Sequence, residues 1–289
     1  MRVAADDVRL YFDVEGSGLT VQGTAMVARP TLVLLHGGPG ADHSLFKPEF
    51  SVIADVAQVI YLDQRGSGRS DRSEAAKWTW TRWADDVAAF CQAIGVGRCV
   101  LLGLSSGGMV GMLCAARHPE LAAGLVLDST FGVPTTLEES LEVFERRGGP
   151  VAREAARRYL GGDTSPAAAE AWKEHGLPLY GSANDGGMAT RRARARINDE
   201  VQAHFRRGGC GPADVAAWAD CITCPTLILA GEDDPVSPAA AALRLAASLR
   251  NSPVQVETLP GVGHGVFRQA PQPAFGLLRS FLRQVAPSD

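Results

Sequence analysis

The sequence predicts an α/β protein in which helices flank a mostly parallel sheet and a helical segment is inserted late in the chain. Short apolar, β-branched runs alternate with segments of helical periodicity, which is the pattern of strands buried on both faces of a parallel sheet. The chain has 289 residues, enough to bury such a core without disulfide bonds. Its composition, 46% hydrophobic and 21% charged residues, is that of an ordinary globular protein.

The expected elements follow one another as strand, helix, strand. The predicted strands are residues 8–14, 19–27, 31–35, 59–62, 99–102, 125–127, 226–229 and 254–258. The first two are expected to form an antiparallel hairpin, and the later ones a parallel sheet because helical segments connect them. Helical periodicity covers residues 80–94, 109–117 and 273–285.

Between residues 131 and 214 the strand pattern stops, and amphipathic segments end at glycine pairs such as Gly161-Gly162. Glycine directly after a helix is a common cap, and Ser165-Pro166 supplies an N-cap followed by proline at the first helical position. We therefore expect a core domain of residues 1–130 and 215–289. A helical cap of residues 131–214 interrupts it after the sixth predicted strand.

Charge excludes several partners. The net charge is -4 and the sequence pI is near 5.9, which gives no electrostatic reason to bind nucleic acid or anionic lipid. The arginines at 191, 192, 194 and 196 alternate with acids nearby, so a solvated helix face is the favoured interpretation. The N-terminus carries two acids and no apolar run of about 18 residues occurs, which indicates a cytoplasmic protein without a membrane span.

The cysteines do not predict a metal site. Six cysteines are too few for a disulfide scaffold in a chain of this length. Cys221 and Cys224 form one C-x-x-C pair, but a zinc site needs further ligands at matched spacing, and none follows nearby. We expect neither a metal nor a cofactor.

A nucleophile is predicted at Ser105. The segment Gly103-Leu104-Ser105-Ser106-Gly107 lies between a predicted strand and a predicted helix. In a G-x-S-x-G elbow the serine occupies a sharp turn above the sheet, and the backbone N–H of the next residue, here Ser106, points toward the developing oxyanion. A chance glycine-rich turn would lack these flanking elements.

A second oxyanion donor is expected in the turn His36-Gly37-Gly38-Pro39-Gly40, which follows the strand at 31–35. The glycine pair can turn a backbone N–H toward the same oxyanion. Gly38 is the preferred donor and Gly37 the alternative, because the sequence does not say which peptide faces inward. His36 is interpreted as a turn residue that bonds to the backbone.

A serine hydroxyl needs a base and a carboxylate that orients the base. Asp234 follows the strand at 226–229, and His264 lies in a glycine-flanked loop after the strand at 254–258. Both loops leave the sheet on the side where Ser105 is expected. Asp233 and Asp128 remain alternatives for the acid, and Asp128 could instead cap the turn after its strand.

These segments, together with residues 63–70, resemble the α/β-hydrolase superfamily, and residues 36–40 and 63–70 resemble its proline iminopeptidase-like branch. The resemblance implies an α/β-hydrolase fold, acyl transfer to water, and Asp234 as the acid, because the G-x-x-D-x-x-x-P pattern of the family falls on residues 231–238. Residues 63–70 are expected to be structural, with Asp63 and Arg65 holding the turn. Proline iminopeptidases usually carry Trp after the nucleophile, where this chain has Ser106.

The function expected is a serine hydrolase that cleaves an ester or amide bond of a small molecule or short peptide through an acyl-enzyme on Ser105. One alternative is an aminopeptidase removing N-terminal proline, with Glu200 of the cap binding the substrate ammonium; Glu200 could equally pair with Arg196 on its own helix. The other alternative is a catalytically silent binding module on the same scaffold, which an intact set of Ser105, Asp234 and His264 disfavours.

Overall fold

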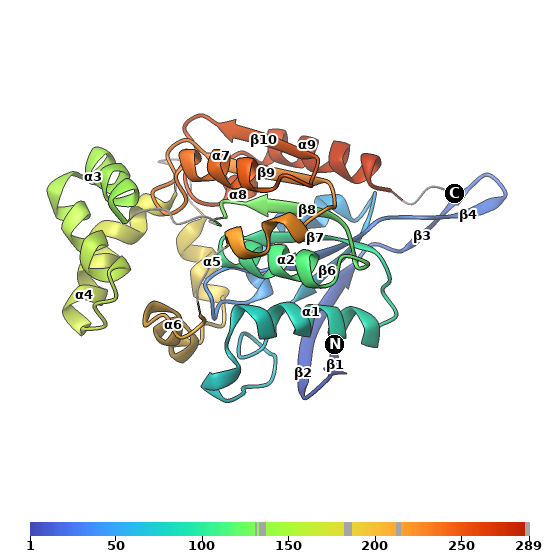
Figure 1. The fold of residues 1–289 in the computed structure, drawn as a ribbon, viewed down its shortest axis with the longest axis horizontal. Helices are drawn as coiled ribbons and strands as arrows, with labels where there is room; N and C mark the ends of the chain where they lie inside the picture. Colours follow the sequence, from blue (N-terminus) through green and yellow to red (C-terminus); the bar gives the residue numbers. More distant parts are fainter. Residues whose placement is uncertain (131, 133–136, 182–186, 212–214, 287–289) are drawn as a thin grey trace.

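The computed structural model describes residues 1–130, 132, 137–181, 187–211 and 215–286. Its centre is an eight-stranded sheet in the order β1-β2-β6-β5-β7-β8-β9-β10 (Figure 1). From β6 to β10 neighbouring strands are parallel, whereas β2 is antiparallel to both β1 and β6. The strands are β1 Arg2–Ala5, β2 Val8–Glu15, β5 Thr31–Leu35, β6 Gln58–Leu62, β7 Cys99–Leu104, β8 Ala122–Asp128, β9 Thr226–Gly231 and β10 Val254–Leu259. The mostly parallel sheet predicted from the sequence is confirmed.

Helices cover both faces of the sheet because successive strand residues point to opposite sides. In β7, Leu101 packs into the core formed with α1 (Trp80–Ala93), α2 (Ser106–Arg117) and α7 (Ala239–Ser248). Its neighbour Leu102 packs into the second core, formed with α8 (Val266–Gln269) and α9 (Pro271–Gln284). The carboxyl ends of the parallel strands are thereby left free to carry the loops of the candidate site.

Among the described residues, four α-helices lie between β8 and β9: α3 (Leu137–Leu160), α4 (Pro166–Ala171), α5 (Met188–Arg194) and α6 (Asp199–Arg206). In Figure 1, α3 and α4 extend to the left of the sheet. A small separate core forms between α3 and the helical turn after α4, where Leu141, Phe144 and Ala156 of α3 pack with Trp172. Ser165 caps α4 as predicted, accepting the Ala168 N–H at 3.2 Å. Residues 131 and 214, the predicted boundaries of the cap, lie outside the described residues, and the division into two domains stays a prediction.

The predicted N-terminal hairpin is wrong in its pairing. Residues 8–15 pair with β1 and β6, whereas residues 19–27 divide into β3 (Leu19–Gln22) and β4 (Ala25–Ala28), which pair only with each other. Gly23, at φ +61°, permits the two-residue turn that divides them. The helical segment therefore follows β8, which is the eighth strand of the structure and the sixth of the predicted strands. The counts differ because β1 was not predicted and because residues 19–27 form two strands instead of one.

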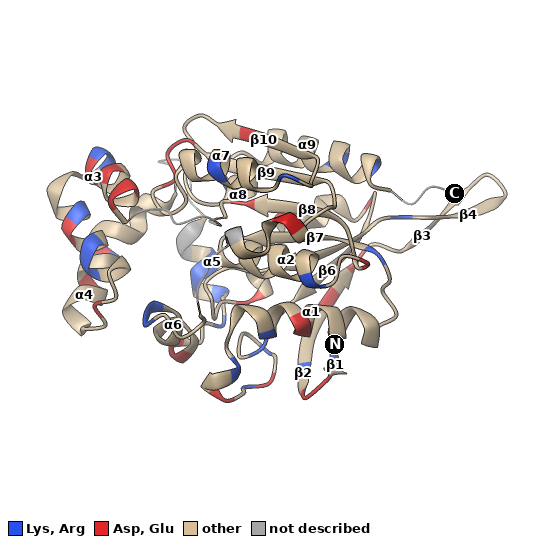
Figure 2. Ribbon diagram, in the orientation of Figure 1, with Lys and Arg blue, Asp and Glu red and all other residues tan. Residues whose placement is uncertain are grey.

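The arginines of α5 attach this helix to the core. In Figure 2 much of the α5 ribbon is blue, the colour of Lys and Arg residues. Arg191 is buried and lies 3.2 Å from a carboxylate oxygen of Glu49, while Arg194 donates to the carbonyl of Ser44 at 3.2 Å. For Arg191 the interpretation as a solvated face is wrong. Among the described helices, none has the length and apolar character that crossing a bilayer requires.

The loop after β6 is held by a buried ion pair, as expected for a structural turn. Arg65 donates to both carboxylate oxygens of Asp86 on α1 at 2.7 Å, and to Asp7 at 2.6 Å. The side chains of Arg65 and Asp86 are only 1% and 3% exposed. Such a pair fixes the loop because removing one partner leaves the other as an unpaired buried charge.

Candidate active site

Ser105 sits in the sharp turn between β7 and α2, at φ 54° and ψ −122°. The turn requires glycines on both sides. A Cβ on Gly103 would lie 2.3 Å from the backbone nitrogen of Gly108, and one on Gly107 would lie 2.0 Å from the carbonyl oxygen of Leu35. The strand, turn and helix predicted for the elbow are therefore present, and the half-buried Ser105 lies at the carboxyl end of the sheet.

Asp234 and His264 form a buried pair. The Nδ1 atom of His264 lies 2.9 Å from Oδ2 and 3.1 Å from Oδ1 of Asp234. Oδ1 also accepts the N–H groups of Val236 and Ser237 at 2.8 and 2.9 Å. Because these donors fix the carboxylate, it can in turn fix the imidazole with its Nδ1 protonated.

Of the three carboxylates considered from the sequence, Asp234 is the one whose side chain bonds to the imidazole. The Asp233 side chain is 41% exposed and lies 3.7 Å from Arg146. Asp128 is buried at the end of β8, where its carboxylate accepts the Val266 N–H at 2.7 Å. The assignment of Asp234 as catalytic acid stays a prediction, which this geometry supports.

Ser105 is connected to the pair through the backbone. Its N–H donates to the carbonyl of Asp128 at 2.8 Å, and the Asp128 side chain holds the loop that carries His264. Within the described part of the chain, no hydrogen bond joins the Ser105 hydroxyl to His264. Catalytic hydrogen bonds of this kind are often long in a free enzyme and shorten when substrate binds. Ser105 as nucleophile and His264 as base stay predictions.

The turn after β5 lies against the elbow, since a Cβ on Gly37 would be 3.1 Å from Cβ of Ser105. Nε2 of His36 accepts the Gln64 N–H at 3.1 Å, so the proton is on Nδ1, which donates to the carbonyl of Gly37 at 3.0 Å. Burial lowers the pKa of His36 and favours this neutral form. Because C=O and N–H of a trans peptide point in opposite directions, the N–H of Gly38 points away from His36.

The N–H groups of Gly38 and Ser106 are available for a ligand. Among the hydrogen bonds given for the described residues, neither N–H is used. Ser106 begins α2, and N–H groups in a first helical turn have no acceptor within the helix. These are the two oxyanion donors predicted from the sequence, and their assignment stays a prediction.

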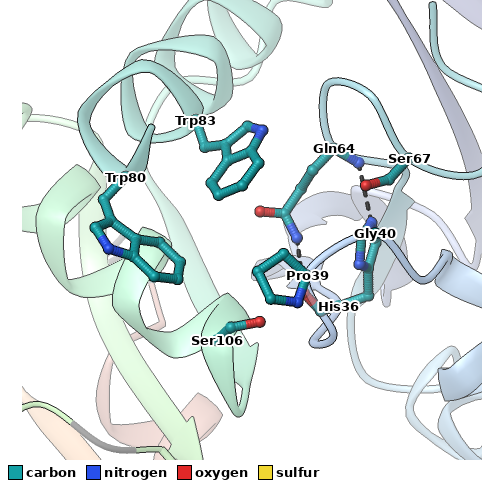
Figure 3. Close-up of a pocket in the computed structure, with 8 residues that line it drawn as sticks. All are labelled: His36, Pro39, Gly40, Gln64, Ser67, Trp80, Trp83 and Ser106. Atoms are coloured by element: carbon teal, nitrogen blue, oxygen red, sulfur yellow. Dashed lines mark hydrogen bonds between the residues drawn. The ribbon is translucent and has the colours of Figure 1, made fainter. Parts of the chain in front are cut away.

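A narrow crevice lies beside this turn (Figure 3), with no room for a water molecule between its walls. Its lining residues are His36, Pro39, Gly40, Gln64, Ser67, Trp80, Trp83 and Ser106. The indole rings of Trp80 and Trp83 come from α1 and lie 5.6 Å apart. Figure 3 shows the side-chain oxygen of Ser106 directed toward Pro39. Trp80 and Trp83 of α1 thus form an aromatic wall of this crevice.

Sequence analysis missed Tyr180 and Arg147, which join the helical segment to the loops that carry His264 and Asp234. The carbonyl of Tyr180 accepts the His264 N–H at 2.6 Å, and its ring meets the imidazole edge to face at 5.0 Å. Arg147 of α3 donates to the carbonyls of Gly181 and Asp233 at 2.6 and 2.7 Å. Burial raises the pKa of Tyr180 and lowers the pKa of Arg147. No sequence pattern marks either residue, because both depend on contacts between distant segments.

Glu200 is exposed in the first turn of α6, and the structure describes no ion pair between it and Arg196. Its helix contacts the turn of residues 36–40 through the N-cap residue Asn198. The N–H of Asn198 donates to the carbonyl of Gly40 at 2.7 Å, and its side-chain amide donates to the carbonyl of Gly66 at 2.7 Å. Glu200 as a substrate-binding residue stays a prediction.

One group of possible metal ligands occurs among the described residues: Asp42, His43 and Asp63. Protein donors already use its oxygens. Asp63 accepts from Nδ1 of His43 at 2.7 Å and from the Arg69 N–H at 2.8 Å, and Asp42 accepts from the Arg69 guanidinium at 2.9 Å. Burial acts to raise the pKa of Asp63, but the hydrogen bonds from His43 and the electrostatic interactions with His36 and His43 together outweigh it, and the pKa is lowered. We interpret the cluster as a structural hydrogen-bond network.

Known proteins share both the sequence pattern and this architecture. A profile of the family described as "alpha/beta hydrolase fold" matches residues 30–271. The chain belongs to this family. This alpha/beta hydrolase is 30% identical over 234 residues to a putative carbamate hydrolase RutD of Variovorax paradoxus, covering 80% of this chain and 84% of that protein. It is 28% identical to 2-(acetamidomethylene)succinate hydrolase of Mesorhizobium japonicum, covering 98% and 99% of the two chains.

Solved structures resemble the hydrolase over its whole length. An esterase from Thermogutta terrifontis, solved with malate bound, has a TM-score of 0.73 and 25% identity, covering 99% of both chains. A proline iminopeptidase from Mycobacterium smegmatis has a TM-score of 0.77 and 23% identity, covering 99% of this chain and 98% of the other. At 23% identity, the likeness to the proline iminopeptidase is evidence of a shared fold and not of a shared activity.

Proposed function

We propose that this hydrolase cleaves an ester or amide bond of a small substrate through a covalent acyl-enzyme on Ser105. The observation that carries the proposal is the buried hydrogen bond between Asp234 and His264, on loops that leave the sheet at the same edge as the Ser105 elbow. The unused N–H groups of Gly38 and Ser106 support it, since they meet the need for oxyanion donors.

In the proposed reaction the hydroxyl oxygen of Ser105 attacks the substrate carbonyl carbon while Nε2 of His264 accepts the hydroxyl proton. The negative charge that forms on the carbonyl oxygen is stabilised by the N–H groups of Gly38 and Ser106. His264 then donates its proton to the departing alcohol or amine, leaving an ester on Ser105. A water molecule, deprotonated by His264, hydrolyses this ester and restores the enzyme. Asp234 holds the imidazole tautomer throughout, and the reaction needs no cofactor.

The relatives favour a small substrate with an acyl group bonded to nitrogen or oxygen. The names of the two curated relatives specify carbamate and acetamidomethylene-succinate hydrolysis, and the esterase acts on esters as its name says. An aminopeptidase is the second candidate. It is favoured by the hydrogen bond from Asn198 to Gly40, which holds α6, the helix of Glu200, against the turn that carries Gly38. There Glu200 would bind the substrate ammonium.

The test uses a fluorophosphonate probe and a panel of p-nitrophenyl esters and aminoacyl naphthylamides. We expect the wild-type enzyme to be labelled at Ser105 and to hydrolyse at least one substrate. Ser105→Ala should abolish labelling and lower kcat by about 10⁶-fold, because a nucleophile in such a triad contributes roughly that much. A folded wild-type protein that is neither labelled nor active would identify a silent binding module instead. Undiminished turnover by the Ser105→Ala variant would refute the nucleophile.

A further inference from the structure

Two residues at the end of strand β8, Asp128 and Ser129, bond to the loops of the proposed site. The backbone carbonyl of Asp128 accepts the Ser105 N–H at 2.8 Å, which holds the elbow. The side-chain oxygen Oδ1 of Asp128 accepts the Val266 N–H at 2.7 Å, two residues after the proposed base. One residue thus contacts both the nucleophile turn and the base loop.

Ser129 adds bonds to the base loop and the acid loop. Its hydroxyl oxygen accepts the Gly265 N–H at 2.7 Å, and its carbonyl accepts the Ser237 hydroxyl at 2.9 Å. Ser129 has φ +50°, in the left-handed region that non-glycine residues rarely occupy. Its own N–H donates to the carbonyl of Leu229 at 2.9 Å, which helps hold this conformation. Such strained residues persist where the surrounding structure determines their conformation.

The hydrogen bond between the Asp128 carboxylate and the Val266 N–H is buried. Asp128 is 2% exposed, and an apolar side chain in its place would leave the Val266 N–H buried without an acceptor. The charged groups that face it are Arg268 and His264, and Ser129 also bonds to it. Burial raises the pKa of Asp128, which shows how far the carboxylate is removed from water.

We propose that Asp128 and Ser129 are positioning residues that hold His264 between Asp234 and Ser105 by binding the backbone of residues 265–266. The inference rests on the proposed function. Neither side chain touches the substrate in this account, because both bond to the backbone behind the imidazole. A displacement of the base by about 1 Å can lower the rate by roughly 10²-fold, so loss of these bonds should act on kcat rather than on KM.

The experiment compares Asp128→Ala, Asp128→Asn and Ser129→Ala with Thr226→Val as the matched control. The Thr226 hydroxyl is also buried and donates to a backbone carbonyl, that of Cys224 at 3.2 Å, but it lies at the amino end of β9, opposite to the candidate site. For each variant kcat and KM are measured with the best ester of the panel, per mole of Ser105 labelled by fluorophosphonate. Circular dichroism and the thermal unfolding midpoint check the fold.

We expect Asp128→Ala to lower kcat by about 10²-fold and Ser129→Ala by about tenfold, with KM within about twofold of wild type. Asp128→Asn should recover most of the loss, because its amide oxygen can still accept the Val266 N–H. Thr226→Val should match the wild type in kcat and KM. Should Asp128→Ala not fold, Ser129→Ala and Asp128→Asn carry the test.

Wild-type kcat in Ser129→Ala and in every folded Asp128 variant would overturn the inference, as would a change confined to KM. An Asp128→Asn variant as impaired as Asp128→Ala would also overturn it, since a positioning bond needs an acceptor and not a charge. These outcomes differ from failure of the proposed function, which is seen in the wild-type enzyme as absence of labelling and turnover.

Discussion

Replacement of Asp234 by asparagine should place the proton of His264 on the wrong nitrogen. Oδ1 of Asp234 accepts two backbone N–H groups, from Val236 at 2.8 Å and Ser237 at 2.9 Å, so the amide oxygen of asparagine must occupy that position. The amide NH₂ group then takes the place of Oδ2. It faces Nδ1 of His264, which in the wild-type protein lies 2.9 Å from Oδ2. Because two donors cannot bond to each other, Nδ1 must lose its proton. The proton moves to Nε2, which can then no longer accept the proton of Ser105.

The expected effect is a fall in kcat of about 10⁴-fold, the cost of the wrong imidazole tautomer in the worked serine-protease case. This corresponds to about 5 kcal/mol of transition-state stabilisation, at 1.36 kcal/mol for each factor of ten. KM should change little, since the Asp234 carboxylate is fully buried and faces the imidazole. The assay is steady-state hydrolysis of the best p-nitrophenyl ester, with circular dichroism to confirm the fold.

The matched control is Asp233→Asn. The Asp233 side chain is 41% exposed and lies 3.7 Å from Arg146, and exposed ion pairs of this kind contribute little. We expect kcat within about twofold of wild type for this control. Retention of more than about a tenth of wild-type kcat by Asp234→Asn would refute the tautomer argument. Equal loss in both variants would refute the assignment of the acid.

Three further predictions concern other parts of the molecule. Arg65→Met should destabilise the fold by about 3 to 5 kcal/mol in urea unfolding, because it leaves Asp86 buried without its bidentate partner. Burial already raises the pKa of Asp86, so protonation should shrink this loss as the pH falls; a loss that grows on acidification would contradict the ion-pair argument. His36→Ala should lower kcat by about 10²-fold by freeing the peptide of Gly38, and affinity for a boronate transition-state analogue should fall with it; unchanged affinity would separate His36 from the oxyanion site. Glu200→Gln should raise KM several-fold for aminoacyl naphthylamides and spare neutral esters, as loss of a charge-assisted hydrogen bond predicts, whereas equal KM values would leave Glu200 as a surface residue of α6.

Local signals predicted the sheet and the elbow because each depends on residues close in the chain. The buried runs of β5 to β10 are continuous and apolar, and the glycines around Ser105 are required by backbone contacts within one turn. The pairing of β2 was predicted wrongly for the converse reason. Residues 8–15 bury alternate side chains against α1 and β6, and nothing in residues 8–27 alone says which neighbour they choose.

Sequence alone determined the fold class, the family, and the three residue types that a serine hydrolase would need at Ser105, Asp234 and His264. The residues by themselves left three carboxylates as candidates for contact with the imidazole, the family resemblance selected Asp234, and no pattern indicated which segments hold His264. The tertiary structure decided these contacts, by placing Asp234 at 2.9 Å from Nδ1 and by bonding the end of β8 and Tyr180 to the backbone of residues 264–266. The contacts of β8 and Tyr180 with the His264 loop join residues more than 80 positions apart in the chain, whereas Asp234 and His264 are 30 positions apart. Their geometry is set by the packing of whole elements, so no local pattern records it.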